Sequence, residues 1–124
     1  MEPRRVLIVD DEVAFTNLVK LNLEKTGRFV VRIVNDPAEA LAAAREFKPE
    51  IALLDVIMPG RDGGQVLAEL RAAGFAELPV IFVTATITQR GLDERDGQIN
   101  GMPFIAKPVD PKKLIKQINK ELED

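Results

Sequence analysis

The chain has 124 residues, the length of a single domain, and its 17 basic and 20 acidic side chains give a net charge of -3. This balance offers no basic surface for nucleic acid or for an anionic membrane, so we expect neither as a direct partner. The sequence contains no cysteine and no histidine, which excludes disulfides, thiolate metal sites and histidine catalysis. Any chemistry must therefore use carboxylates, hydroxyls and lysine.

Apolar runs in the sequence are short. None approaches the length of a membrane span, and residues 1–5 are followed at once by strand-like residues instead of the apolar core of a signal peptide. We therefore expect a soluble, cytoplasmic protein. No linker, repeat or low-complexity stretch interrupts the chain, so we expect one domain that covers residues 1–124.

Five of the short apolar runs have the length and composition of strands. They lie at residues 6–9, 29–34, 51–54, 80–83 and, more weakly, 104–106. Four of them are almost continuously apolar, which is typical of strands buried on both faces of a parallel sheet. Helical patterns alternate with them, and strict alternation over the whole length predicts a five-stranded, doubly wound α/β fold.

Four helices can be placed from apolar spacing, at about 13–25, from 36 onward, at about 64–73 and from 110 onward. An Asp-Pro pair opens the second and the last, which is typical of a helix N-terminus. The side chains expected to face the sheet are Ala14, Leu18 and Leu21 in the first helix, Ala38, Leu41 and Ala42 in the second, Val66, Leu67 and Leu70 in the third, and Leu114, Ile115, Ile118 and Leu122 in the last.

Residues 88–102 should hold a further helix, the fourth in chain order, but they fit a helix poorly. Three glycines fall within or just after the segment, and each interior glycine costs about 1 kcal/mol relative to alanine. Leu92 and Ile99 are its few apolar side chains, so little burial offsets that cost. We expect an atypical fourth helix, short or frayed, whose ordering is part of any conformational switch.

Polar side chains stand where the predicted strands end. Asp10 and Asp11 follow the first strand, Asp55 the third, Thr84 the fourth and Lys107 the fifth. In an open parallel sheet the carboxyl ends of the strands form the ligand site, so these groups should converge. Crowded carboxylates call for a divalent cation, and a few carboxylates with carbonyl and water oxygens suit Mg²⁺ better than Ca²⁺.

Such a site is suited to phosphoryl transfer. A carboxylate such as Asp55 can be the nucleophile and form an acyl phosphate, while Lys107 neutralises one phosphoryl oxygen and Thr84 donates a hydrogen bond to another. Pro108 allows a cis peptide bond that would point the Lys107 ammonium into the site.

Four segments together resemble the receiver domains of two-component response regulators, and in particular the chemotaxis regulators. They are VLIVDDE at 6–12, LDVIMPGRDG at 54–63, VTA at 83–85 and FIAKP at 104–108. The resemblance covers essentially the whole chain. It implies a flavodoxin-like parallel sheet with strand order 2-1-3-4-5 and five helices.

The resemblance also implies roles for individual residues. Asp55 would accept a phosphoryl group from a sensor histidine kinase or a phosphotransfer protein, and Lys107 would assist. Asp10, Asp11 and Asp55 would hold Mg²⁺ together with the backbone carbonyl of Ile57.

Thr84 and Phe104 would form a switch pair. On phosphorylation the Thr84 hydroxyl would move toward the phosphoryl group and the Phe104 ring would turn inward, which reshapes the face of helix four, strand five and helix five. An apolar ring at 104 also fits plain core packing. Downstream partners would be an output domain or protein, and the resemblance allows a phosphorylation-linked homodimer.

A receiver domain is not a conventional enzyme, because it catalyses only its own phosphorylation and dephosphorylation. We expect the dephosphorylation to be slow, since Ile57 and Thr86 flank the path of the attacking water and bring neither a carboxylate nor an amide. The chain fits both a stand-alone protein and the N-terminal receiver of a longer one.

Three other functions share parts of this pattern. A phosphatase of the haloacid-dehalogenase type needs a second acid two residues after its nucleophile, where this chain has Ile57. A flavin-binding module needs a phosphate loop after the first strand, where Asp10, Asp11 and Glu12 would repel phosphate. A degenerate receiver that acts as a phosphorylation-independent protein-interaction module stays open, although all five family positions are intact.

Overall fold

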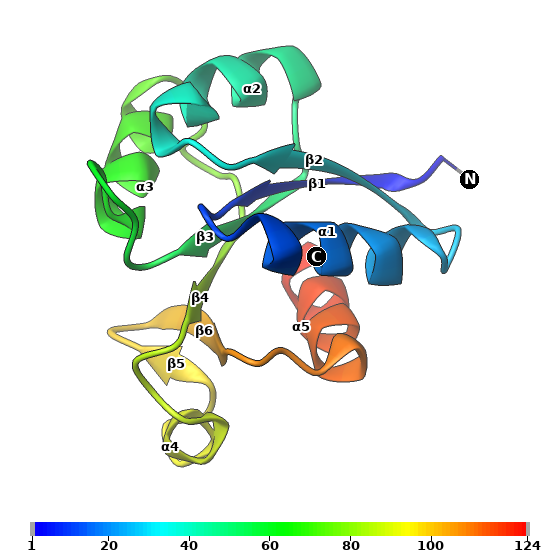
Figure 1. Ribbon diagram of the computed structural model, residues 1–124, viewed down its shortest axis with the longest axis vertical. Coiled ribbons are helices and arrows are strands. Elements are labelled where there is room, and N and C mark those ends of the chain that lie inside the picture. The colour runs from blue at the N-terminus through cyan, green and yellow to red at the C-terminus, as the bar shows by residue number, and fades with distance from the viewer. Residues whose placement is uncertain (1, 124) are drawn as a thin grey trace.

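Six strands form one sheet in the computed structural model, which describes residues 2–123 (Figure 1). The strands are β1 (Arg4–Val9), β2 (Phe29–Val34), β3 (Ile51–Asp55), β4 (Val80–Thr84), β5 (Gln98–Ile99) and β6 (Met102–Ala106). Their spatial order is β2-β1-β3-β4-β6-β5, in which all neighbours are parallel except β5, which runs antiparallel to β6. The predicted parallel order 2-1-3-4-5 is thus confirmed, with β6 as the fifth parallel strand.

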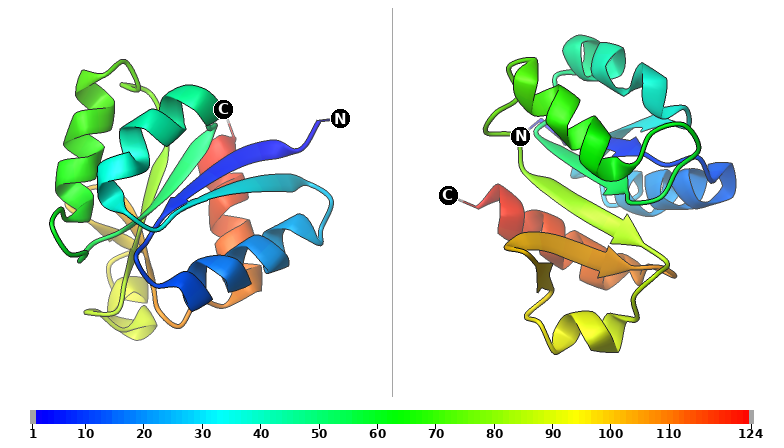
Figure 2. Two further views of the ribbon diagram at one scale, coloured as in Figure 1. Left: turned by 45° about the horizontal axis from the view of Figure 1, so that its top comes forward. Right: turned by 90° about the vertical axis from the view of Figure 1, so that its left-hand side faces the viewer.

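Helices cover both faces of this sheet (Figures 1 and 2). They are α1 (Val13–Glu24), α2 (Ala40–Phe47), α3 (Gly63–Ala72), α4 (Gln89–Asp93) and α5 (Pro111–Leu122), with a 3-10 turn, Pro37–Glu39, before α2. One face carries α2 and α3, and the other carries α1 and α5. None of the helices within residues 2–123 is both long enough and apolar enough to cross a membrane.

The central strands are buried on both faces, as their continuous apolar runs predict. Alternate side chains of one strand enter two different cores. In β1, Leu7 and Val9 pack with α2 and α3, whereas Val6 and Ile8 pack with α1 and α5. Each fully buried side chain of this kind contributes about 1.5–3 kcal/mol to the stability of the fold. The two cores therefore hold the strands, and with them the strand ends, in place.

The face of α1 that packs on the sheet differs from the prediction. Ala14, Leu18 and Leu21 were expected inward, but Leu18 is 55% and Leu21 64% exposed, and Ala14 is exposed as well. The buried side chains are Thr16, Val19 and Leu23. The helix carries two stripes that include apolar residues. The prediction did not use the stripe that contains Thr16, because threonine is polar. Its hydroxyl can be buried because it donates to the Val13 carbonyl at 3.0 Å.

The prediction for the second helix was also partly wrong. Ala38 and Ala42 are exposed and Leu41 is half-buried, while the buried side chains are Ala40, Ala43 and Ala44. The first turn is 3-10, with three residues per turn, and this rotates the following α-helical residues relative to a continuous α-helix.

The inward faces predicted for the third and last helices are confirmed. Val66 and Leu70 are buried in α3, and Leu114 and Ile118 in α5. The other expected residues, Leu67, Ile115 and Leu122, are partly buried against the same cores.

Helix α4 is as short as its glycines suggest, with five residues. Leu92 anchors it and is fully buried. The rest of the segment turns back on itself, and β5 forms a hairpin with β6 in which Ile99 faces Met102. Asn100 and Gly101 between them have φ values of 52° and 78°. An Asn-Gly pair is the preferred two-residue hairpin turn, so this sequence signal, which was not used, would have predicted the hairpin.

Gly63 fixes the geometry between β3 and α3. Its backbone NH donates to the Val56 carbonyl at 2.9 Å. A Cβ at this position would lie 2.4 Å from the Asp55 carbonyl oxygen, which no side chain can tolerate. The loop after β3 therefore closes onto Asp55 only because residue 63 is glycine.

We predict that Gly63→Ala lowers the free energy of unfolding by roughly 2 kcal/mol, because the loop must move away from Asp55 to relieve the contact. Gly64→Ala is the matched control, since a Cβ there meets only the flexible Asp62 carboxylate at 3.3 Å. Because Gly64 lies within α3, this change should be neutral or should stabilise the protein by up to about 1 kcal/mol. Urea unfolding measures both, and equal effects would contradict the steric account.

Candidate functional site

The strand ends bring the predicted polar residues together. Oxygen atoms of Asp10, Asp11 and Asp55 all lie within 4.8 Å of one another. The Lys107 ammonium lies 2.8 Å from Asp10 Oδ2 and 3.7 Å from Asp55 Oδ1. Asp10 and Asp55 are buried and Asp11 is exposed, so the cluster opens to solvent on the side of Asp11.

Asp10 is held in place by its backbone and by one side-chain oxygen. Its NH donates to the Val34 carbonyl at 3.0 Å, and its carbonyl accepts from Asn35 Nδ2 at 2.8 Å. Asp10 Oδ1 accepts from the Glu12 NH at 2.9 Å. The buried Oδ2 faces the Lys107 ammonium at 2.8 Å, its one close partner among the described residues. A buried carboxylate needs such a positive partner, whether an ammonium or a metal ion.

Lys107 approaches the cluster from the end of β6. Its peptide bond to Pro108 is cis, as the sequence suggested, and its backbone NH donates to the Thr84 carbonyl at 2.7 Å. The ammonium contacts Asp10 and also Glu12 Oε1 at 2.6 Å. Burial opposes its charge, but the carboxylates of Asp10 and Glu12 outweigh that effect and raise the pKa of Lys107 above its ordinary value.

Asp55 lies in a negative and poorly solvated environment. Burial, followed by the charge of Asp10, raises the pKa of Asp55 from 3.8 to about 6, with further contributions from Asp11 and Glu12. Lys107 acts in the opposite direction but does not compensate. Asp55 is therefore mostly ionised at neutral pH, but at a cost in free energy.

Thr84 and Phe104 lie on neighbouring strands, two positions apart in register. The Thr84 side chain is buried, and its hydroxyl is engaged by Thr86, with 2.7 Å between the two hydroxyl oxygens and 3.0 Å from the Thr86 NH. The Phe104 ring is half-buried, 5.1 Å from the ring of Phe82 between centroids. Both side chains are thus held by local contacts in this conformation.

This arrangement matches a known family. Residues 6–119 fit the family model described as the response regulator receiver domain. The chain belongs to that family. It is therefore a domain of two-component signalling and not a conventional enzyme.

Solved structures similar to this receiver domain support the assignment. The Vibrio cholerae chemotaxis protein CheY4 is 25% identical, with 95% of this chain and 98% of that chain covered and a TM-score of 0.80. A CheY-like receiver domain from Methanospirillum hungatei is 27% identical, with 97% and 94% covered and a TM-score of 0.78. The receiver domain of a Desulfovibrio desulfuricans diguanylate cyclase, described as an example of alternate folding, is 29% identical, with 97% and 94% covered and a TM-score of 0.76.

The site of this receiver domain can hold a metal ion. Its carboxylates are hard oxygen donors, and the single Lys107 ammonium faces three of them while Asp11 adds a fourth, so the local charge is negative. Oδ2 of Asp10, which here faces the Lys107 ammonium, could also face a metal ion. Ile57 lies on the loop that leaves β3, with its side chain 63% exposed and directed away from the core.

Two residues of the site escaped the sequence prediction. Asn35 follows β2 and connects it to the end of β1 and to α1, since Nδ2 donates both to the Asp10 carbonyl and to Thr16 Oγ1. Reading the residue after the second strand in the same way as the others would have found it. Glu12 was expected only as part of a motif and as a charge that repels phosphate, and its contact with Lys107 spans 95 positions that no local pattern connects.

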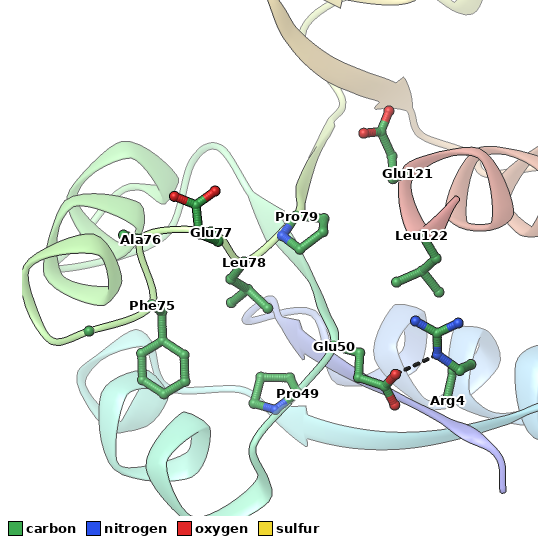
Figure 3. A pocket seen from close by; sticks show the side chains of 11 residues that line it. Arg4, Pro49, Glu50, Phe75, Ala76, Glu77, Leu78, Pro79, Glu121 and Leu122 are labelled. Carbon is green, nitrogen blue, oxygen red and sulfur yellow. Dashed lines mark hydrogen bonds and ion pairs between the residues drawn. The ribbon is translucent and has the colours of Figure 1, made fainter. Parts of the chain in front are cut away.

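A second hollow lies at the opposite end of the sheet, near the amino-terminal ends of β1, β3 and β4 (Figure 3). It has a volume of about 510 Å³. Its lining includes three carboxylates, Glu50, Glu77 and Glu121, and Glu50 is paired with Arg4. Within residues 2–123, the acidic group close enough to hold a metal is Asp10, Asp11 and Asp55 at the carboxyl ends of the strands.

The raised pKa of Asp55 makes a prediction about stability in the absence of divalent metal. The folded state binds a proton at Asp55 more tightly than the unfolded state, so the contribution of Asp55 to stability falls as the pH rises from about 4 to about 6 and stays unfavourable above that range. Asp55→Asn should therefore raise the free energy of unfolding at pH 7 by as much as roughly 3 kcal/mol.

At pH 4 the same substitution should have little effect, because Asp55 is then largely protonated in the folded state. Urea unfolding with a chelator present measures both conditions. A gain at pH 4 equal to that at pH 7 would show that packing, and not charge, explains the difference.

Proposed function

We propose that this receiver domain accepts a phosphoryl group on Asp55 in a reaction that needs Mg²⁺. The observation that carries the proposal is the position of the Asp55 carboxylate at the end of β3, with Asp10 and Asp11 on one side and the Lys107 ammonium 3.7 Å away. A nucleophile, a cation site and a fixed positive charge are the parts that phosphoryl transfer to a carboxylate requires.

In the proposed reaction an Asp55 carboxylate oxygen attacks phosphorus as the bond to the donor's nitrogen or oxygen breaks, and the donor leaves with that bonding pair. Asp55 must be ionised to attack, and with a pKa of about 6 it is mostly so at pH 7. Asp10, Asp11, Asp55 and the Ile57 carbonyl would hold the Mg²⁺. When bound, the ion neutralises charge on the carboxylates and on the phosphoryl oxygens.

Lys107 would neutralise one phosphoryl oxygen, and Thr84 would donate a hydrogen bond to another. The Lys107 ammonium is already ordered by its neighbours, so little conformational entropy is lost when it turns to the phosphoryl group. Thr84 would have to exchange its contact with Thr86 for a hydrogen bond to phosphoryl oxygen. That exchange is a discrete local change with two end states.

We propose that this exchange reshapes the face formed by α4, β6 and α5. Phe104 and Ile105 line a hollow of about 730 Å³ there, together with lysines of α5 such as Lys116. Movement of Thr84 would act on the loop that enters α4, and rotation of Phe104 would change the apolar part of the hollow. An output domain or protein would read this face, and a phosphorylation-linked homodimer could use the same surface.

The phosphoryl donor would be a sensor histidine kinase or a phosphotransfer protein. Self-dephosphorylation should be slow, because the exposed Ile57 is apolar and Thr86 brings only a hydroxyl. Neither group is placed to activate a water as a carboxylate would. The receiver therefore suits a signal that persists.

A small phosphodonor tests the proposal directly. With acetyl phosphate and Mg²⁺, the wild-type protein should gain one phosphoryl group by intact-mass spectrometry, and hydroxylamine, which cleaves acyl phosphates, should remove it. Asp55→Ala should gain none. A chelator should prevent the labelling of wild type.

The Glu50 carboxylate, which is paired with Arg4 at the other end of the sheet, provides the control. Glu50→Gln should be labelled as wild type is. Equal labelling of wild type and Asp55→Ala would refute the assignment of the phosphoacceptor, and absence of labelling in wild type would favour a degenerate receiver.

A further inference from the structure

Glu12 makes the shortest contact to the Lys107 ammonium. Its Oε1 lies 2.6 Å from Lys107 Nζ, compared with 2.8 Å for Asp10 Oδ2 and 3.7 Å for Asp55 Oδ1. The last distance is too long for a hydrogen bond. In this conformation the ammonium is therefore paired with Asp10 and Glu12. Asp55 interacts with it only through longer-range electrostatic attraction.

The surroundings of Lys107 leave it few other positions. Its side chain is 10% exposed, and the Phe15 ring lies under the ammonium at 4.5 Å from the ring centroid. An ammonium has three donor hydrogens, two of which are directed to Asp10 and Glu12. Contact with a phosphoryl group on Asp55 thus requires Lys107 to give up or lengthen one of these two pairs.

The two carboxylates differ in what they lose on release. The Asp10 side chain is 1% exposed and would be left buried without its cation, whereas the Glu12 side chain is 60% exposed and can be hydrated at once. An uncompensated buried charge is far more costly than a solvated one. Glu12 is therefore the partner that Lys107 can leave.

We propose that Glu12 is a positioning residue that holds Lys107 away from Asp55 in the unphosphorylated state and competes with the incoming phosphoryl group for the ammonium. The proposal rests on the phosphoacceptor function argued above and adds a restraint to it. Glu12 touches neither the metal nor the phosphoryl group, and it acts only through Lys107. Its side chain sets how readily the receiver is phosphorylated.

The test is the rate constant of phosphorylation by acetyl phosphate at fixed Mg²⁺, followed by intact mass. Glu12→Gln removes the charge at constant size and should raise the rate constant about two- to fivefold, the range expected when an exposed ion pair no longer competes. Glu12→Asp keeps the charge but is one methylene shorter. It should also be faster than wild type, because the shorter side chain reaches the ammonium less well although the charge is kept.

Two further variants separate this contact from a general charge effect. Glu39→Gln removes an exposed carboxylate that makes no ion pair within residues 2–123 and precedes α2 at the same rim of the sheet. It should leave the rate unchanged. In a Lys107→Met background, which is slow by itself, Glu12→Gln should have no additional effect.

Several results would overturn the proposal. They are a Glu12→Gln rate equal to or below that of wild type, a Glu12→Asp rate equal to wild type beside a faster Glu12→Gln, or an undiminished effect of Glu12→Gln in the Lys107→Met background. These results differ from a failure of the proposed function. In that case wild type itself would not be labelled at Asp55.

Discussion

Three carboxylates share one ammonium at the carboxyl edge of the sheet. Asp10, Glu12 and Asp55 all lie near Lys107, and Asp11 adds a fourth negative charge beside them. Together with burial, this imbalance raises the pKa of Asp55. It also explains why the site would bind a divalent cation and why a phosphoryl group could then be accommodated among so many negative charges.

The fold supports this crowding with a small number of close contacts. Asn35 joins β2 to the end of β1, and the missing side chain of Gly63 lets the loop after β3 close over the Asp55 backbone. Both cores lie beneath these strand ends, so the carboxylates cannot separate to relieve their repulsion. The repulsion is therefore a property of the folded state that binding of a cation can remove.

Much of this could be predicted because it depends on short-range patterns. Continuous apolar runs located the strands, and the rule that parallel strands end at one edge grouped Asp10, Asp55 and Lys107. The face of α1 was wrong because Thr16 is buried through a hydrogen bond to its own helix, which hydrophobic spacing does not register. The hairpin of β5 was predictable from Asn100 and Gly101 but was expected as part of a helix.

Contacts that depend on side-chain reach could not be predicted. The pairing of Glu12 with Lys107 and the contact between the Thr84 and Thr86 hydroxyls require coordinates. Sequence patterns determine neither side-chain rotamers nor how the loops after β1 and β6 lie against each other. Under the proposed function, these same contacts determine which groups would have to move on phosphorylation. The residue types thus indicate the chemistry of the site. The contacts that hold Lys107 and Thr84 in this conformation can be found only from the geometry.

The most direct test of the account is the free energy of unfolding as a function of Mg²⁺ concentration, in wild type and in Asp11→Asn. If the carboxylates Asp10, Asp11 and Asp55 form the metal site, wild-type stability should rise by about 1.4 kcal/mol for each tenfold increase in Mg²⁺ above the dissociation constant. Asp11→Asn should show little of this rise and should be at least as stable as wild type when metal is absent. A wild-type stability that does not respond to Mg²⁺, or an equal response in Asp11→Asn, would contradict the account.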